Sequence, residues 1–190
     1  MEQFSFLNYL PVLIILAITW MIGVWIKKIS KNYPPSSTEK NSLSGVGGWL
    51  LLLTLQLMIL GPLLDAGRIN FSFISMENEF PNLKTIPNWS IYKNWVWFVM
   101  GLKFLIGFYA GLKLIKDRNP SAINQVKVII WITGPVAGLI LGVFLPEIIF
   151  GSVQIGSEFI GPFLSLTITC IVWTIYLSKS NRVKATYGTK

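Results

Sequence analysis

The sequence predicts an all-α, polytopic membrane protein with five transmembrane helices, one N-terminal helix followed by a four-helix bundle. The first observation is composition: 53% of the 190 residues are hydrophobic and 13% are charged, whereas an ordinary soluble domain is about 25% charged. The second is that five apolar runs follow one another, and roughly 20 apolar residues are enough to cross the hydrocarbon core of a bilayer as a helix. The third is the one-sided distribution of the 16 basic residues, which assigns the loops to sides.

The first apolar run, residues 7–26, is expected to be an uncleaved anchor with its N-terminus outside. Only Glu2 carries charge before the run, while Lys27, Lys28 and Lys31 follow it. A cleaved signal peptide has the opposite order, with basic residues ahead of the apolar stretch. We therefore expect residues 1–44 to form an N-terminal transmembrane anchor and a basic cytoplasmic linker. Residues 45–190 are expected to form a four-helix transmembrane domain with a basic C-terminal tail.

The other four predicted spans are residues 49–64, 94–115, 126–145 and 158–177. Gln56 is the strongly polar residue inside the first of these, and Pro62 weakens its far end. Residues 65–93 are expected to be a long and unusually apolar loop, which lies on the membrane interface or folds over the helix ends. Pro135 predicts a kink in the span over 126–145.

Orientation follows from the basic residues near the span ends. Five spans place the first loop, the third loop and the C-terminal tail on one side. Those segments contain 12 of the 16 basic residues: Lys27, Lys28, Lys31, Lys40, Lys113, Lys116, Arg118, Lys127, Lys179, Arg182, Lys184 and Lys190. Because cytoplasmic loops of membrane proteins are enriched in Lys and Arg, we expect an outside N-terminus and a cytoplasmic C-terminus.

Small residues predict which helix faces pack. In lipid, close helix contacts depend on small side chains that let two backbones approach. The span over 126–145 has three glycines four apart, the span over 94–115 has two, and a series of glycine and hydroxyl residues with the same spacing runs along the last span. The expected packing glycines are Gly107, Gly111, Gly134, Gly138, Gly142 and Gly161, with Ser165 and Thr169 continuing the last series. We expect the third, fourth and fifth spans to form a close bundle.

Lys103 is a charged residue near the centre of a predicted span, and it defines a candidate polar site. A charge at that depth costs at least about 2.5–3.5 kcal/mol on insertion scales, so a partner must offset it. The candidates are Gln56, the hydroxyls of Ser165 and Thr169, a water-filled pocket, or one of the acidic residues Asp65, Glu147 and Glu158. Two interpretations follow: an anion or proton site, or a lysine that snorkels or bonds to backbone carbonyls at a packed interface.

Two short motifs carry a family resemblance. They are Gly45-Val46-Gly47-Gly48-Trp49-Leu50 and Ser180-Asn181-Arg182-Val183-Lys184-Ala185-Thr186-Tyr187. Together with the four spans between them, the chain resembles the YdgK-like family of small bacterial inner-membrane proteins of unknown function, over about residues 45–188. The resemblance implies a bacterial inner (plasma) membrane location and four spans, so the N-terminal span is a departure, and no activity is carried over.

Both motifs are expected at the cytoplasmic surface. Gly47 and Gly48 permit a tight turn into the helix, and Trp49 suits the headgroup level. Arg182 and Lys184 can meet lipid phosphates, at about 1 kcal/mol each. The motifs serve either as topology and anchoring signals or as a docking site for a cytoplasmic partner.

Composition also excludes several function classes. The chain has no histidine and one cysteine, Cys170, so the commonest general base and metal ligand are missing. We expect no enzyme activity, no cofactor, no metal site and no nucleic acid partner. The favoured function is a multi-pass accessory or interaction protein that binds the lipid bilayer, anionic phospholipids and a membrane-protein partner or a second copy. The alternative is a small oligomeric transporter or channel that uses Lys103 in a polar intramembrane pocket.

Overall fold

The computed structural model describes residues 10–34, 44–151 and 157–189. Every regular element in these ranges is helical, and five helices are long and apolar enough to cross a membrane, by length and composition: Leu13–Ser30, Trp49–Glu79, Pro87–Lys116, Pro120–Phe150 and Phe159–Lys179. This confirms the predicted all-α class and the number of spans. The N-terminal tail, the linker over 35–43 with Lys40, and Lys190 lie outside the described residues.

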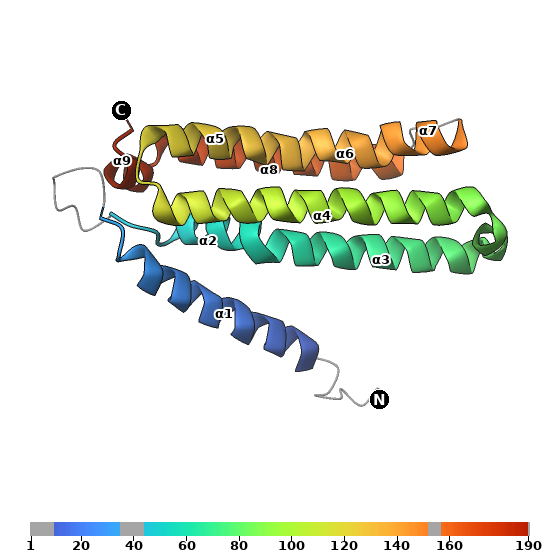
Figure 1. Ribbon diagram of the computed structural model, residues 1–190, viewed down its shortest axis with the longest axis horizontal. Coiled ribbons are helices and arrows are strands. Elements are labelled where there is room, and N and C mark those ends of the chain that lie inside the picture. Colours follow the sequence, from blue (N-terminus) through green and yellow to red (C-terminus); the bar gives the residue numbers. More distant parts are fainter. Residues whose placement is uncertain (1–9, 35–43, 152–156, 190) are drawn as a thin grey trace.

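The helices follow one another as an antiparallel series (Figure 1). The first is α1 (Leu10–Ser30). The second is continuous through α2 (Trp49–Leu55), η2 (Gln56–Leu60) and α3 (Gly61–Glu79). After η3 (Pro81–Thr85) comes α4 (Pro87–Lys116). The fourth runs through α5 (Pro120–Trp131), η4 (Ile132–Val136), α6 (Ala137–Leu139), η5 (Ile140–Phe144) and α7 (Leu145–Phe150). The last two are α8 (Ser157–Lys179) and the short α9 (Asn181–Tyr187).

Residues 65–93 are helical except at Phe80 and Ile86, and the prediction of a long loop there is wrong. The second helix continues to Glu79, a single 3₁₀ turn over Pro81–Thr85 reverses the chain, and α4 already begins at Pro87. Two apolar residues of this segment pack between helices: Phe73 and Trp89 are buried, with ring centroids 5.5 Å apart at 82°. The two helices therefore form a long hairpin whose tip has its own small core.

Prolines interrupt the second and fourth helices. Pro135 lies in a π-helical turn beside Gly134, whose φ and ψ of −93° and −105° are not helical; this confirms the predicted kink. Proline has no backbone N–H, and its ring crowds the carbonyl four residues earlier. The same strain explains the π-helical turns that end two residues before Pro62 and Pro146. The helix continues through Pro62, with a wider π-helical turn before it.

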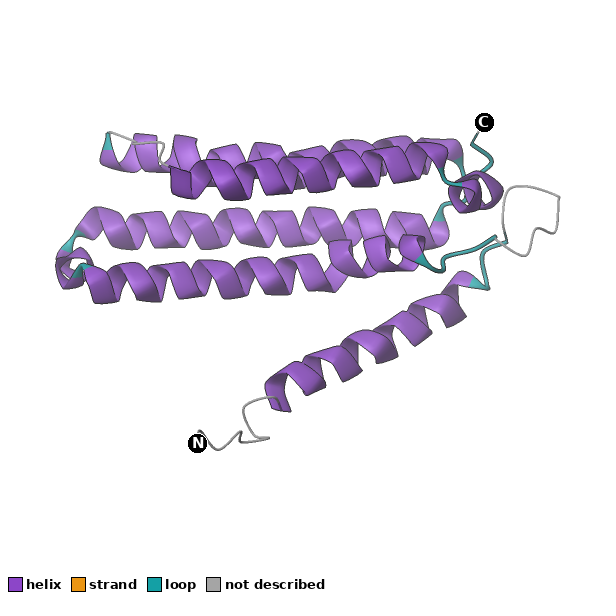
Figure 2. Ribbon diagram, turned by 180° about the vertical axis from the view of Figure 1, so that it is seen from behind, coloured by secondary structure: helices purple, strands orange, loops and turns teal. Residues whose placement is uncertain are grey.

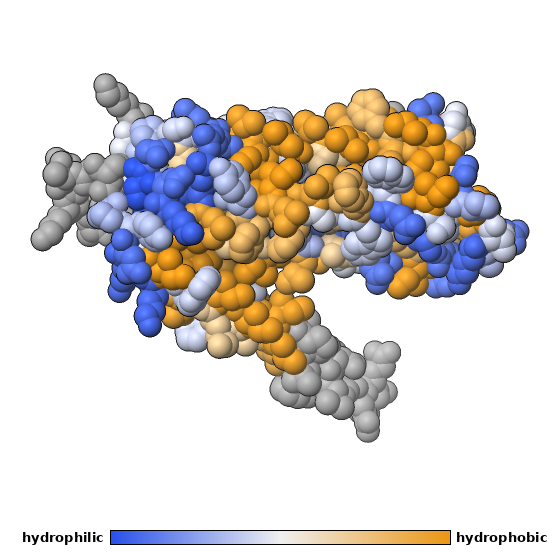
Figure 3. Space-filling view, in the orientation of Figure 1, coloured by the Kyte–Doolittle hydropathy of each residue, from blue (hydrophilic) through white to orange (hydrophobic). Residues whose placement is uncertain are grey.

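Most of the buried residues cluster near one end of the bundle, around α9. This core joins Ile26, Leu50, Leu114, Val126 and Leu177, one from each long helix, and Tyr187 from α9. Ten basic residues surround it: Lys27, Lys28, Lys31, Lys113, Lys116, Arg118, Lys127, Lys179, Arg182 and Lys184. We call this the basic end. Figure 3 shows hydrophilic atoms there and at the opposite tip, with an apolar band between them.

Helix α1 differs from the other four long helices because it leaves the bundle. Figures 1 and 2 show it beside the bundle at the basic end and diverging toward its N-terminus. Gly23 packs near Leu55, and Ile26 is fully buried, whereas Leu16 and Trp20 are 59% and 73% exposed. The described chain is therefore a four-helix bundle with one splayed helix.

Candidate functional site

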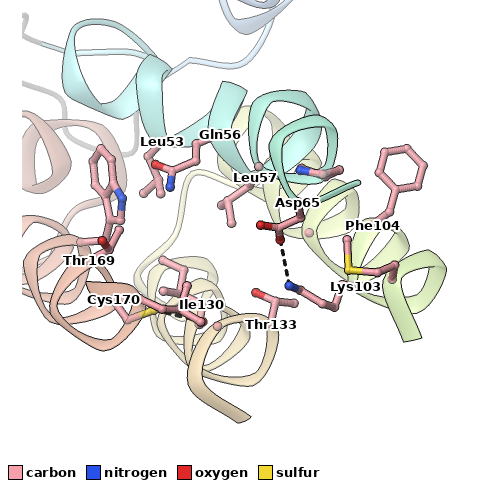
Figure 4. Close-up of a pocket in the computed structure, with 17 residues that line it drawn as sticks. Leu53, Gln56, Leu57, Asp65, Lys103, Phe104, Ile130, Thr133, Thr169 and Cys170 are labelled. Atoms are coloured by element: carbon pink, nitrogen blue, oxygen red, sulfur yellow. Dashed lines mark hydrogen bonds and ion pairs between the residues drawn. The ribbon is translucent and has the colours of Figure 1, made fainter. Parts of the chain in front are cut away.

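A cavity of about 130 Å³ lies between the second, third, fourth and fifth helices. Its walls are mostly apolar, and its polar side chains are Gln56, Asp65, Lys103, Thr133 and Thr169. Figure 4 shows these residues arranged around the cavity, with the Lys103 and Asp65 side chains pointing toward each other. The cavity therefore collects polar groups from four helices inside the apolar band.

The Lys103 ammonium has an acidic partner on the neighbouring helix. Its Nζ lies 2.9 Å from Oδ2 of Asp65, and the two side chains are 17% and 36% exposed. Asp65 is one of the partners that the sequence left open. It projects from α3 three residues after Pro62, beyond the π-helical turn. An opposite charge at this distance offsets part of the cost of placing a lysine among apolar helices.

The other predicted polar residues divide into two groups. Gln56 and Thr169 line the same cavity as Lys103, although the Thr169 hydroxyl donates to the Ser165 carbonyl within its own helix at 2.9 Å. Ser165 is exposed and is not part of the cavity lining. The cavity meets α8 at Leu166, Thr169, Cys170 and Trp173, and Ser165 lies one turn before Thr169, outside this lining.

Thr133 is a lining residue that the sequence analysis missed. Thr133 lies directly before the Gly134–Pro135 kink, and its hydroxyl donates to the Ile129 carbonyl, four residues earlier in the same helix, at 2.8 Å. The sequence signal that could have identified Thr133 is its position directly before Gly134-Pro135, where irregular helix backbone is expected. Two of the polar lining residues, Gln56 and Thr133, thus lie in π-helical turns. Such turns occur frequently at functional sites.

Five of the six predicted packing glycines lie at close helix contacts. A Cβ built on Gly107 would lie 2.7 Å from the Leu57 carbonyl oxygen, and Gly111 faces Met58. On the fourth helix, Gly134 faces Cys170 at 2.6 Å, Gly138 faces Leu166 at 3.3 Å, and Gly142 faces Phe159. Larger side chains at Gly107 or Gly134 would force the neighbouring helices apart.

The fourth long helix lies against both α4 and α8, as the expected bundle requires, but the expected contacts of the α4 glycines and of Gly161 are wrong. The glycines of α4 contact the second helix, and only those of the fourth helix contact α8. Gly161 is exposed, and a Cβ built there meets no atom within 4 Å. It lies four residues from Ser165 on an outward stripe of α8. The spacing of small residues does not by itself determine whether a stripe faces another helix.

At the basic end, the two motifs that carry the family resemblance contact each other. The Gly45 N–H donates to the Thr186 hydroxyl at 2.9 Å, and that hydroxyl donates to the Arg182 carbonyl at 2.7 Å. A Cβ built on Gly47 would lie 2.9 Å from the Arg182 Nη1 atom. Gly48 has a φ of 56°, which favours glycine. The glycine turn before the second helix thus forms the surface against which α9 packs.

The other two predicted interface residues, Trp49 and Lys184, face outward. Trp49 is 65% exposed and makes an edge contact with the Trp173 ring, at a centroid distance of 6.4 Å. Lys184 is exposed on α9, on a different face from the half-buried Arg182. Only Arg182 of the two basic residues is held against the glycine turn.

Tyr187 fixes α9 to the bundle. It is fully buried, and its hydroxyl donates to the Leu114 carbonyl near the end of α4. Burial raises the pKa of this phenol well above its ordinary value. The Arg118 guanidinium lies 5.7 Å from the Tyr187 ring centroid and donates to the Ser30 carbonyl at 3.2 Å. Burial lowers the Arg118 pKa, and contact with Tyr187 opposes that shift.

The fold and the cavity define a class: an all-helical protein with five apolar helices, consistent with a membrane protein, that encloses a charge pair. The chain belongs to the family described as "Protein of unknown function (DUF2569)", whose match covers residues 43–188. That range closely matches the stretch identified by the two motifs and begins after α1, while the YdgK-like name stays a prediction. No curated protein and no solved structure matches the chain.

Proposed function

We propose that the protein resides in a bacterial inner membrane, with the N-terminus outside and the basic end in the cytoplasm. The proposal is supported by the grouping of ten described basic residues around one end of the bundle. The opposite tip has a balanced set of charges, with Lys93 paired to Glu77 at 2.6 Å. Positive charge is retained on the cytoplasmic side of membrane proteins, so the asymmetry of the folded chain favours the same orientation as the sequence.

Within that membrane, the protein acts as a non-enzymatic accessory protein that binds a helix of another membrane protein. The observation that carries this function is an apolar groove of about 500 Å³ between the second helix and α4. Pro62, Leu63 and Ala66 line one side, and Gly101 and Phe104 line the other. No charged residue lines it among the described residues.

A transmembrane helix is the occupant that the groove fits. At the basic end, α1 already packs against the same two helices, and the groove continues along them where α1 diverges. Ala66 and Gly101 supply small side chains, which permit close helix approach in lipid. A Cβ on Gly101 meets nothing within 4 Å, so this part of the groove is open. The proposed partner is therefore an apolar helix of a different membrane protein, seated beyond α1.

Site-specific photocrosslinking tests this function. A photoreactive residue at Leu63, which is 53% exposed in the groove, is expected to give one discrete protein adduct. The same residue at Val172, which is 56% exposed on α8, is the matched control and is expected to give none. Gly101→Leu fills the groove and is expected to abolish the Leu63 adduct. Gly67→Leu, at an exposed glycine of the same helical hairpin outside the groove, is expected to preserve it.

Several outcomes would contradict the accessory function. An adduct with the mass of two copies of this chain would make the groove a self-association surface. Adducts with lipid alone would make it a lipid-facing surface. Equal adducts from Leu63 and Val172 would show that contact is unspecific.

A second candidate function is transport through a small oligomer, and the cavity around Lys103 favours it. Ionisable residues inside membranes frequently mark ion or proton pathways. Broken helices beside a midplane site are typical of transporters, and π-helical turns border this cavity. Its volume of about 130 Å³ has room for a few water molecules. Oligomerisation would have to supply the rest of a pathway.

A further inference from the structure

A second recess lies at the basic end, and neither proposed function uses it. It is a crevice of about 450 Å³ between the last turn of α1, the turn before α2 and helix α9. Three cationic side chains from two distant parts of the chain line it: Lys27, Lys31 and Arg182. The backbone of Gly45 to Gly48 forms part of its wall. No described lining residue is Asp or Glu.

The three cations lack acidic partners in the part of the chain that the structure describes. The ion pairs found there join Lys93 to Glu77, Lys103 to Asp65, and Lys113 to Asp117. Like charges gathered around one crevice repel one another. An anion in the crevice would relieve that repulsion.

Arg182 is the best-positioned of the three groups. Its guanidinium lies against the Gly47–Gly48 backbone, where a Cβ on Gly47 would be 2.9 Å from Nη1 and one on Gly48 would be 3.8 Å from Nε. The glycines therefore set the place of the guanidinium by letting it approach the chain. A planar guanidinium presents paired N–H donors that match the oxygens of a phosphate group.

The surroundings of the crevice indicate a lipid and not a soluble anion. Two exposed tryptophans lie on the elements that form it: Trp25 is 57% exposed less than two turns before the end of α1, and Trp49 is 65% exposed at the start of α2. Tryptophan rings gather at the headgroup level of bilayers. A shallow apolar recess formed by Gly48, Trp49 and Leu52 adjoins the crevice, where the beginning of an acyl chain can lie.

We propose that this crevice binds the phosphate group of an anionic phospholipid, with Arg182, Lys27 and Lys31 around the phosphate and Trp49 beside the acyl chain. The site is separate from the groove between the second helix and α4, so the accessory function can fail while the lipid site stands. It also gives the two family motifs a common purpose. The glycine turn and α9 together build the wall that places Arg182.

Native mass spectrometry of the purified chain in detergent tests the proposal. The probes are phosphatidylglycerol, phosphatidylcholine and inorganic phosphate, each titrated separately. We expect phosphatidylglycerol to be retained at lower concentration than phosphatidylcholine. Arg182→Gln is expected to raise the apparent dissociation constant for phosphatidylglycerol about fivefold, since one such charge is worth about 1 kcal/mol at an anionic lipid surface.

The matched control is Lys184→Gln, which removes one charge from the exposed face of the same helix and is expected to leave binding unchanged. If Arg182→Gln fails to fold, the double variant Lys27→Gln/Lys31→Gln takes its place, with an expected loss larger than fivefold. Equal losses at Arg182 and Lys184 would reduce the site to diffuse surface charge and overturn the proposal. Equal retention of the two lipids, or displacement of phosphatidylglycerol by inorganic phosphate alone, would overturn it too.

Discussion

At the scale of single residues, the pairing of Lys103 with Asp65 decides how a charge is tolerated among apolar helices. The pair joins α4 to α3 at 2.9 Å beside a cavity lined by Thr133 and Gln56. Removing one member leaves the other charge without a partner, and this usually costs more than replacing both. The pair can thus be essential to folding without any part in transport.

Two variants separate these roles. Lys103→Met is expected to destabilise the protein by about 2 kcal/mol, because Asp65 then lies partly buried and unpaired. The double variant Lys103→Met/Asp65→Asn is expected to recover much of that loss. Unfolding of the purified proteins in detergent measures both. A double variant less stable than the single would contradict the assignment of Asp65 as the partner.

The same variants test the transport candidate in proteoliposomes. Transport through this cavity predicts a proton or anion flux in the wild type that the stable double variant lacks, measured with an entrapped pH-sensitive dye and with chloride efflux. If wild-type vesicles are no more permeable than empty ones, the pair is structural and the transport candidate is excluded.

Sequence reasoning placed Lys103 correctly on a face with small residues but left its partner open. Periodicity along one helix gives the direction of a side chain, whereas a partner on another helix depends on how the two helices are aligned. Asp65 was one of several acids within reach of a long lysine side chain. The π-helical turn before Pro62 also rotates Asp65, and no helical wheel includes that rotation.

At the scale of elements, α9 joins several helices at the basic end. Seven residues are too few for a stable isolated helix, so its contacts must hold it. The Gly45 N–H donates to Thr186, and the Tyr187 hydroxyl donates to the Leu114 carbonyl. These bonds tie the start of the second helix and the end of the third to the C-terminal tail.

Tyr187→Phe tests how much the hydrogen bond from Tyr187 contributes to stability. We expect a loss of about 1 kcal/mol in unfolding free energy at neutral pH, since one buried hydrogen bond is removed while Arg118 still donates to the Leu114 carbonyl. Burial raises the folded-state pKa of Tyr187, so the wild type gains stability from the neutral phenol that is present below the unfolded pKa of about 10. That stability is lost as pH rises above this value.

The comparison of wild type and Tyr187→Phe in detergent at neutral and at strongly alkaline pH separates the two effects. The difference between the two proteins should shrink at alkaline pH. An unchanged difference would mean that the phenol is not buried in the folded protein.

The ends of the two hairpin helices could not be predicted from the sequence. The sequence predicts that the second span ends near Leu64, because Pro62 weakens the helix there and the charged Asp65 follows. A helix is limited by its own backbone and packing, not by lipid thickness. Phe73 and Trp89 bury against each other beyond that point, and the Trp89 ring nitrogen donates to Glu77 at 2.9 Å. These contacts stabilise helix where the hydropathy signal is weak.

At the scale of the whole molecule, composition and run length predicted the all-helical class and the five spans, which the structure confirms. The neighbour relations were less predictable. Small-residue stripes identified Gly134, Gly138 and Gly142 as contacts but gave no partner for each stripe, and Gly107 and Gly111 of α4 face the second helix and not the fourth. The order of helices in a bundle depends on long-range packing that a single apolar run does not encode.

The proposed threading is tested by labelling introduced cysteines in intact cells, in a chain with Cys170→Ser. Glu79→Cys, exposed near the hairpin tip, is expected to react with a membrane-impermeant maleimide before lysis. Lys184→Cys, exposed on α9, is expected to react only after lysis. The parent chain without cysteine is the control. Labelling of Lys184→Cys in intact cells would reverse the orientation and move the lipid crevice to the outer leaflet.

The great length of the second helix has a consequence for what holds different parts of this molecule together. Its 31 residues extend about 46 Å, against a hydrocarbon thickness of about 30 Å. In a bilayer with one helix end at the hydrocarbon boundary, about 16 Å of the hairpin extends past the hydrocarbon, through the headgroup layer and into water. Lipid gives apolar side chains no incentive to associate, but water does. Phe73 and Trp89 are then held together as in a small soluble protein, and urea should loosen that tip before it disturbs the helices below.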